Sequence, residues 1–598
     1  MNANAILHSL HRQQALRDID LAFAELLARL GGNDETQLAG ALAMRAIALG
    51  HSGFALVRAQ ELLEELQAEA ALPDAVAWET ALRASELVAA DTSTPAPLVL
   101  EHGRVSLRRY ARYESELARR IAQRAARDAD APVDADAHRI DALRRLFDLP
   151  APELDRQALA AWLALRRRLL LVTGGPGTGK TTTVARVLAL LLSADIAPRI
   201  ALAASTGRAA ARLGEAIAAS VQRDVEAGRL DPALAERIPH QARTLHRLLG
   251  WRGGKVDFVH GPDNPLPFDV VVVDEASMID LPLMAKLVAA VRDDAALVLI
   301  GDPDQLPAVE AGDVLGALCD AAGDGVSLPP ALAAAASTAL QAEVPAAAEA
   351  SPLPGHRVHL QRGYRQADSA RLSRLAQAAG AGDAEAVLAT LREDGEGVRW
   401  REGDASRLEA ALADFALPDY RAMLAAPDPQ AALRLAARTR VLTALRNGPF
   451  GAAAWNAWFA HRLGGNAASP WFHGRLVMVT ANDYRLNLFN GDTGIAWEDE
   501  RGGIAVWFER HDAPWRPAQL PAHETAFAGT VHKAQGSEFD RVALVLPDAD
   551  ARVLNRELVY TALTRARREV LLWGSEQCLR EAIGRRSRRD TGLAARLR

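Results

Sequence analysis

The residues with the clearest chemical meaning are Gly-Gly-Pro-Gly-Thr-Gly-Lys-Thr at positions 174–181, which follow an apolar run at 169–173 and precede a helix-forming run. This spacing, in a strand–loop–helix context, is typical of a phosphate-binding loop, because glycines let successive backbone N–H groups point at one phosphate cluster. Lys180 would reach the β- and γ-phosphates, and the Thr181 hydroxyl would bind Mg²⁺. An ordinary tight turn is the alternative, but glycine spacing, lysine and flanks all agree with the loop. The expected nucleotide contacts are Gly174, Gly175, Pro176, Gly177, Thr178, Gly179, Lys180, Thr181 and Thr182.

Two carboxylates, Asp274 and Glu275, follow four consecutive valines at 270–273. The valines predict a parallel strand buried on both faces, and two carboxylates at its end would be costly without a cation. We expect Asp274 to hold Mg²⁺ and Glu275 to polarise the attacking water in phosphoryl transfer. The alternative is a strand that simply leaves the core at an Asp-Glu turn. A further apolar strand at 297–300 leads to Gln305, whose amide could sense a γ-phosphate.

The composition sets broad limits on the protein class. A chain of 598 residues predicts several domains, on a prior of ~100–200 residues each. With 49% hydrophobic and 24% charged residues, the chain has an ordinary globular composition. Its net charge of −6 gives no global sign of a nucleic-acid binder, although a basic groove can lie within an acidic whole. Two cysteines cannot build a disulfide framework, and we see neither a signal peptide nor a membrane span, so we expect a cytoplasmic protein without membrane contact.

Periodicity divides the chain into parts. Residues 1–140 predict a mostly helical domain with a short hairpin at 98–107, and because it carries no catalytic constellation we interpret it as a packing or docking module. Residues 141–358 and 359–578 each predict an α/β unit. Short strands with turns at about 464–523 predict a small β-barrel-like insertion in the second unit.

Two further segments stand out by composition. The Ala/Pro-rich stretch 321–354 is interpreted as a surface insertion. The arginine-rich end, residues 579–598, is expected to be a solvated basic tail, with a nucleic-acid or partner contact as the alternative.

Together, these motifs resemble those of superfamily 1 DNA helicases, most closely the RecD family, the alpha subunit of exodeoxyribonuclease V. The nucleotide motifs at 174–181, 274–277 and 301–307 carry the general resemblance. The segments that look RecD-specific are 107–110, 244–250, 445–450, 488–492, 530–540 and 560–567. Ser205 and Arg208 stand where the family usually has proline and lysine.

The resemblance implies an α/β fold with two RecA-like P-loop lobes, 141–358 and 359–578, an N-terminal docking domain and an SH3-like insertion. It also implies an ATP- and Mg²⁺-dependent 5′→3′ helicase or translocase on single-stranded DNA. The chain would be the motor of a RecBCD-type heterotrimer that processes double-strand breaks for recombinational repair, with RecB- and RecC-like partners and the nuclease centre elsewhere. Two rivals remain: an ATP-switched DNA-binding regulatory subunit without processive translocation, and a stand-alone P-loop ATPase acting on protein.

The resemblance further assigns individual residues. Gln157 would contact adenine, and Arg365 and Arg565 would be arginine fingers that complete the catalytic set of Lys180, Glu275 and Gln305. Cations that cross a cleft onto the γ-phosphate stabilise spreading charge and tie hydrolysis to lobe closure. Alone, either arginine would be interpreted as a surface residue. The remaining implied contacts are to nucleotide, by Gly536 and Glu538, and to DNA or the coupling path, by Thr206, His246 and His532.

Overall fold

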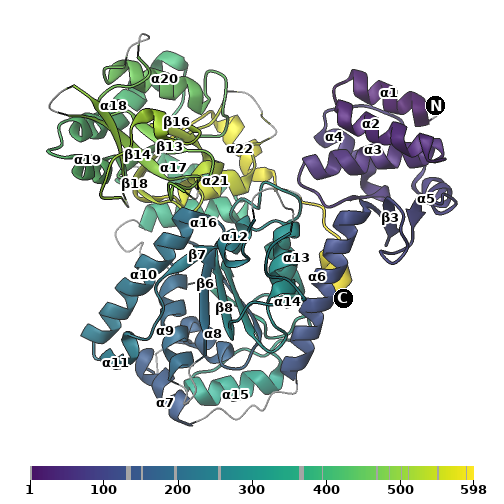
Figure 1. The fold of residues 1–598 in the computed structure, drawn as a ribbon, viewed down its shortest axis with the longest axis horizontal. Helices are drawn as coiled ribbons and strands as arrows, with labels where there is room; N and C mark the ends of the chain where they lie inside the picture. The colour runs from purple at the N-terminus through teal and green to yellow at the C-terminus, as the bar shows by residue number, and fades with distance from the viewer. Residues whose placement is uncertain are drawn as a thin grey trace.

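The computed structural model describes residues 3–129, 137–149, 153–193, 198–252, 257–361, 370–393, 395–465, 469–483, 485–499, 502–509, 511–548, 551, 553–587 and 589–598. Figure 1 shows two α/β lobes stacked on each other and a smaller N-terminal part beside them. The two parallel sheets confirm the predicted α/β fold class. The predicted domain boundaries stay predictions. In the described part of the chain, no helix combines the length and the apolar character needed to cross a membrane.

The N-terminal part combines helices with one small sheet in the order β1-β4-β3-β2. Its elements are α1 (Ala3–Arg12), α2 (Asp18–Arg29), α3 (Asp34–Ala48), β1 (Phe54–Ala55), α4 (Ala59–Glu65), α5 (Ala75–Arg83), β2 (Val88–Ala89), β3 (Leu98–Glu101) and β4 (Arg104–Leu107). The expected hairpin is present as β3 and β4, and its turn places His102 and Gly103 at φ +50° and +68°. Helix α6 (Arg108–Ala129) follows directly and packs on α13 (Leu281–Ala290) of the first lobe.

The first lobe is centred on a six-stranded parallel sheet in the order β10-β5-β9-β8-β6-β7. Its strands are β5 (Leu169–Gly174), β6 (Ile200–Ala204), β7 (Ala242–Thr244), β8 (Val270–Asp274), β9 (Ala296–Gly301) and β10 (Arg357–Leu360). Helices cover both faces, which explains why the strands are nearly continuous apolar runs. One face carries α7 (Ala137–Leu146), α8 (Arg156–Ala164), α9 (Lys180–Leu192), α10 (Gly207–Glu226), α11 (Pro232–Ala235) and α15 (Pro330–Leu340). The other carries α6, α12 (Leu245–Leu248), α13, α14 (Val314–Ala322) and α23 (Leu593–Leu597).

The second lobe is centred on a five-stranded parallel sheet in the order β11-β19-β18-β12-β17. Its strands are β11 (Val398–Arg401), β12 (Thr439–Thr443), β17 (Ala528–Thr530), β18 (Phe539–Val545) and β19 (Ala566–Trp573). One face is covered by α16 (Ala370–Ala381), α17 (Ala384–Arg392), α21 (Arg556–Leu563) and α22 (Glu576–Gly584). The other is covered by α18 (Ala405–Leu424), α19 (Pro429–Ala436) and α20 (Ala452–Arg462).

A separate antiparallel sheet lies between α20 and β17 in the sequence. Its strands, in the order β15-β14-β13-β16, are β13 (Leu476–Val479), β14 (Thr493–Glu498), β15 (Ile504–Phe508) and β16 (His523–Thr525). It encloses a small core that includes Val477, Leu488 and Phe508. The predicted β-rich insertion is therefore present, and its SH3-like character stays a prediction.

Two expectations drawn from composition are wrong. The arginine-rich end is not a solvated tail, because α23 packs on α6 and α14 and buries Leu593 and Leu597. The alanine-rich segment is not only surface, because α15 buries Leu332, Ala336 and Leu340 against the core of the first lobe. In both segments, apolar residues recur at helical spacing within a biased composition, so burial on one face outweighs the average character of the sequence.

Candidate active site

The candidate site lies where the lobes meet, at the carboxyl ends of β5, β8 and β9. Parallel strands place these ends at one edge of the sheet, which is where open α/β sheets bind ligands. A cleft of about 420 Å³ opens there, with walls from both lobes. The predicted residues that line it are Gln157, Pro176, Gly177, Gly179, Lys180, Thr181, Thr182, Asp274, Glu275 and Gln305 from the first lobe and Gly536, Glu538 and Arg565 from the second. One cavity thus unites most of the predicted nucleotide site.

The phosphate loop depends on glycine backbone geometry. Gly177 and Gly179 have φ of +78° and +83°, in the left-handed region that disfavours other residues. A Cβ atom on Gly179 would lie 2.1 Å from Nε2 of Gln157, and one on Gly174 would lie 2.7 Å from the carbonyl oxygen of Leu360. Lys180 begins α9, and its Nζ donates to the carbonyl oxygens of Gly174 (2.5 Å) and Gly175 (3.0 Å). The lysine is therefore curled over the loop that precedes it.

Gln157 holds this loop through a hydrogen bond to its backbone. It lies near the start of α8, is buried, and donates from Nε2 to the carbonyl oxygen of Thr178 over 3.0 Å. Asp155 caps the helix by accepting from the backbone N–H groups of Gln157 and Ala158. The predicted adenine contact stays a prediction, and the structure adds a second task for this side chain, which is to fix the loop.

Asp274 and Glu275 form the acidic wall of the cleft. Burial, and after it the charge of Glu275, raise the pKa of Asp274 to about 6. Glu275 has φ +53° and ψ +45°, a left-handed conformation that is costly for a residue with a side chain and is found preferentially at functional sites. Its N–H donates to Oδ1 of Asp274 over 2.8 Å. Two adjacent, half-buried carboxylates fit a divalent cation, and Thr181 lines the same cleft.

Gln305 lies in a segment that the second lobe holds directly. Its Nε2 donates to Oδ2 of Asp302 over 3.0 Å, and the Tyr560 hydroxyl donates to the same oxygen over 3.0 Å. The N–H of Leu306 donates to Oγ1 of Thr561 over 2.9 Å, which makes a second bond across the lobes. The motif patterns had marked both runs, but the pairing of Asp302 with Tyr560 carried no sequence signal.

Arg565 reaches the cleft from the second lobe. It is 2% exposed and donates from Nε to the carbonyl oxygen of Thr561 (3.1 Å) and from Nη1 to that of Ser537 (3.2 Å). It lines the same cavity as Lys180 and Glu275. The other predicted finger, Arg365, lies outside the described residues.

Comparison with known proteins identifies the family. Residues 12–105 match the model described as the N-terminal domain of the RecBCD enzyme subunit RecD, residues 157–311 an AAA domain, and residues 525–573 a UvrD-like helicase C-terminal domain. The RecBCD enzyme subunit RecD of Mycobacterium tuberculosis is 38% identical over 617 residues, which cover 100% of this chain and 97% of that protein. The chain belongs to the RecD family.

Other relatives of this RecD family member extend the likeness. The RecBCD enzyme subunit RecD of Mycolicibacterium smegmatis is 38% identical, with 98% of each chain covered. The ATP-dependent RecD2 DNA helicase of Deinococcus radiodurans is 33% identical over 72% of this chain and 50% of that protein. The resemblance inferred from the motifs is thereby confirmed at the level of the family.

The three DNA candidates of this RecD chain do not line the nucleotide cleft. Thr206 caps α10 by accepting from the N–H of Ala209. The ring of His246 lies 5.7 Å from that of Phe258, and burial lowers its pKa. Burial also lowers the pKa of His532, in the short turn before Gln535. Their contact with DNA stays a prediction.

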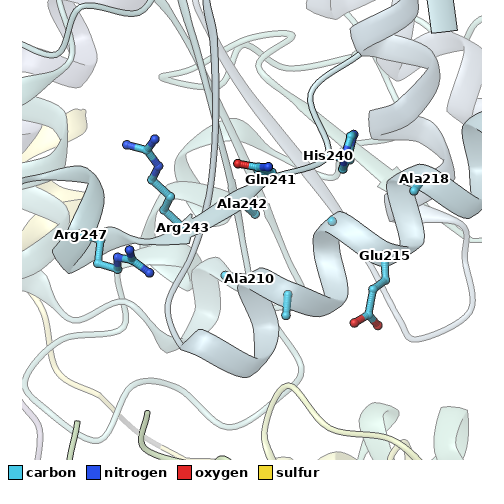
Figure 2. A pocket seen from close by; sticks show the side chains of 10 residues that line it. Ala210, Glu215, Ala218, His240, Gln241, Ala242, Arg243 and Arg247 are labelled. Atoms are coloured by element: carbon cyan, nitrogen blue, oxygen red, sulfur yellow. The ribbon is translucent and has the colours of Figure 1, made fainter. Parts of the chain in front are cut away.

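A second, wider cavity of about 730 Å³ lies between α10 and the edge strand β7. Figure 2 shows Arg243 and Arg247 at one end of it and His240 toward the other. Its floor is made of small residues, and a Cβ atom on Gly214 would lie 2.1 Å from the carbonyl oxygen of His240. This groove begins next to His246 and presents two cations on the surface of the first lobe.

Proposed function

We propose that this chain is an ATP-driven motor that moves 5′→3′ along single-stranded DNA as the helicase subunit of a RecBCD-type complex. One observation carries the proposal: Lys180 from one lobe and Arg565 from the other line the same cleft, with Asp274 and Glu275 in its wall. A site divided in this way hydrolyses nucleotide only when the lobes are together, so that each turnover is tied to a relative movement.

The residues have separate tasks in this scheme. The phosphate loop binds the phosphates through its N–H groups, and Lys180 moves from the carbonyls of Gly174 and Gly175 onto the β- and γ-phosphates. Thr181 and Asp274 would hold Mg²⁺, which when bound neutralises phosphate charge. Glu275 orients the attacking water, while Arg565 stabilises the charge that develops on the γ-phosphate.

Gln305 connects nucleotide state to lobe position. Its neighbours Asp302 and Leu306 bond to Tyr560 and Thr561 of the second lobe, so displacement of Gln305 by a γ-phosphate would strain these bonds. A change at the γ-phosphate would thereby reach the lobe interface through Gln305, Asp302 and Leu306.

DNA would lie across both lobes. Thr206, His246 and His532 are the proposed contacts, and the cations of Arg243 and Arg247 favour a phosphate backbone nearby. Such contacts are tolerant of sequence and weaken as salt rises. The names of the mycobacterial relatives support RecB- and RecC-like partner subunits, and the family resemblance supports the 5′→3′ direction.

Strand displacement tests the proposal. Duplexes with either a 5′ or a 3′ overhang are offered to the chain with ATP and Mg²⁺, with and without RecB- and RecC-like subunits. We expect unwinding from the 5′ overhang and ATP turnover stimulated by single-stranded DNA. Stimulation without unwinding would favour the regulatory subunit, and turnover indifferent to DNA would reject the motor altogether.

A further inference from the structure

Arg212 lies in the nucleotide cleft and has no part in the scheme above. It projects from α10 of the first lobe, and its guanidinium forms an ion pair with Glu538 of the second lobe. Its Nη1 lies 3.5 Å from the carbonyl oxygen of Gly536. The side chains of Arg212 and Glu538 are 30% and 11% exposed, so the pair is partly shielded from water. Arg212 thus contacts the second lobe at the Glu538 carboxylate and at the Gly536 carbonyl oxygen.

The charges around Arg212 favour this position. Burial alone would lower its pKa, but Glu538, and then Glu275 and Asp274, raise the pKa overall. The guanidinium therefore faces a carboxylate from each side of the cleft. Glu538 has a second partner, Arg567, whose Nε lies 3.1 Å away and whose side chain is 53% exposed. Arg567 belongs to the same lobe as Glu538, so Arg212 is the partner that bridges the lobes.

The segment held by Arg212 also carries the support of Arg565. Three of the bonds that hold residues 535–538 connect this segment to the cleft. Nε2 of Gln535 donates to the carbonyl oxygen of Leu306 over 2.8 Å, the Ser537 carbonyl accepts from Nη1 of Arg565, and Glu538 pairs with Arg212. Movement of Glu538 would therefore move the carbonyl that orients the guanidinium of Arg565.

We propose that Arg212 is a positioning residue for ATP hydrolysis, which holds Glu538 and, through residues 535–538, aligns Arg565 with the phosphate loop. The inference rests on the proposed ATP hydrolysis at this cleft and adds a residue to it. Because Arg212 acts on alignment in the closed state, its loss should lower kcat more than it raises KM.

The test compares Arg212→Ala and Arg212→Lys in steady-state ATP hydrolysis by the full chain, with and without single-stranded DNA. For Arg212→Ala we expect kcat to fall by about 10–100-fold, since small misplacement of a catalytic group has effects of this size. KM should change by less than about threefold. Arg212→Lys should recover part of kcat, because lysine keeps the charge but lacks the planar fork. A wild-type kcat in Arg212→Ala would overturn the proposal.

Two controls separate this role from simpler ones. Arg567→Ala removes the other partner of the same carboxylate, outside the cleft lining, and should lower kcat by less than about threefold. In a double-mutant cycle, Arg212→Ala should cost little when Glu538 is already alanine. An undiminished cost in that background would show that Arg212 acts independently of Glu538 and would overturn the proposal.

Failure of the motor can be told apart from failure of this inference. If wild-type turnover is indifferent to single-stranded DNA, the motor is rejected, whereas the kcat of Arg212→Ala without DNA still decides the role of Arg212. A normal melting temperature in Arg212→Ala is expected, and a drop in kcat explained wholly by unfolding would count against positioning.

Discussion

The nucleotide cleft and the junction at the C-terminus both join distant parts of the chain through charged side chains. The two regions differ in how far donors within the protein neutralise their carboxylates. At the junction, which we define as residues 585–587 and 589–598 with their partners, carboxylates are surrounded by donors. Oδ1 of Asp590 accepts from Arg58 (2.8 Å) and Arg104 (2.5 Å) of the N-terminal part. These cations neutralise its charge within the protein itself.

Glu114 on α6 shows the same principle more strongly. It is 1% exposed, and its Oε1 accepts from the hydroxyls of Ser52 (2.5 Å) and Thr591 (2.8 Å) and from the N–H of Gly592 (2.8 Å). Arg596 lies beside its other oxygen. This carboxylate therefore fastens the end of the chain to the N-terminal part without need of any ligand.

In the cleft, Glu538 pairs with Arg212 and Arg567, but Asp274 and Glu275 have no such set of donors among the described residues. Asp274 has a raised pKa, Glu275 is held in a left-handed conformation, and Lys180 bonds to backbone carbonyls rather than to an anion. The difference teaches how to separate structural from functional charge in this fold. Charges that the protein satisfies internally hold it together, whereas charges that it buries without full compensation indicate a ligand.

The strongest way to break this comparison is Lys180→Gln. Glutamine keeps much of the length of lysine but removes the charge that would meet the phosphates, so ATP turnover should fall at least ~100-fold. The melting temperature and the affinity for single-stranded DNA should change little, because Lys180 bonds only to its own loop among the contacts described. Turnover is followed by phosphate release and binding by fluorescence anisotropy. Substantial activity in this variant would remove Lys180 from the chemistry.

The contrast also explains what the sequence could predict. Gly174 to Thr181 form one continuous motif, and Asp274 and Glu275 are adjacent, so local pattern was enough to place them in one site. Arg565, which is distant in the chain, is placed at this site only by the family resemblance. The pairing of Arg212 with Glu538 gives no sequence signal.

Arg212 and Glu538 are far apart in the sequence and belong to different lobes, so they meet only when both sheets have folded. The prediction of a solvated tail at residues 579–598 is wrong for the same reason. Its arginines suggest solvent, whereas Asp590 and buried Leu593 fix it to distant residues. Composition reports the average of a segment, but burial of one face decides where it goes.

Glu114→Ala would sharpen the comparison from the side of the junction. It removes the acceptor of several buried donors, and loss of a buried charged partner costs ~3 kcal/mol or more, which for a chain of 598 residues should lower the melting temperature by at least ~2 °C. Turnover per folded molecule should be little changed, since Glu114 is remote from the cleft lining. Thermal melting and ATP hydrolysis are measured on the same samples.

The matched control for Glu114→Ala is Glu116→Ala on the same helix. Glu116 pairs with Arg119 and Arg120 but is 37% exposed, so its loss should cost less than ~1 kcal/mol. Equal destabilisation by the two variants would contradict the view that burial and saturation of Glu114 make the junction.

The smallest expected effect is on folding stability and has the opposite sign to that of Glu114→Ala. Asp274→Asn should stabilise the protein. The folded-state pKa of Asp274, about 6, lies above its ordinary value of 3.8, so the ionised carboxylate opposes folding. The effect is full above pH 6, shrinks as the pH falls toward 4, and vanishes only below the ordinary pKa, where both states are protonated. In EDTA at pH 8, Asp274→Asn should therefore stabilise the protein by ~1–2 kcal/mol, while turnover is lost.

Asp269, just before the same strand, is the control. Its bonds to Arg199 lower its pKa, so Asp269→Asn should destabilise the protein at pH 8. Melting curves from pH 4 to 8 measure the gain in stability. A gain from Asp274→Asn that did not shrink toward pH 4 would not come from the charge of Asp274. That charge would then be compensated within the protein, as charges at the junction are.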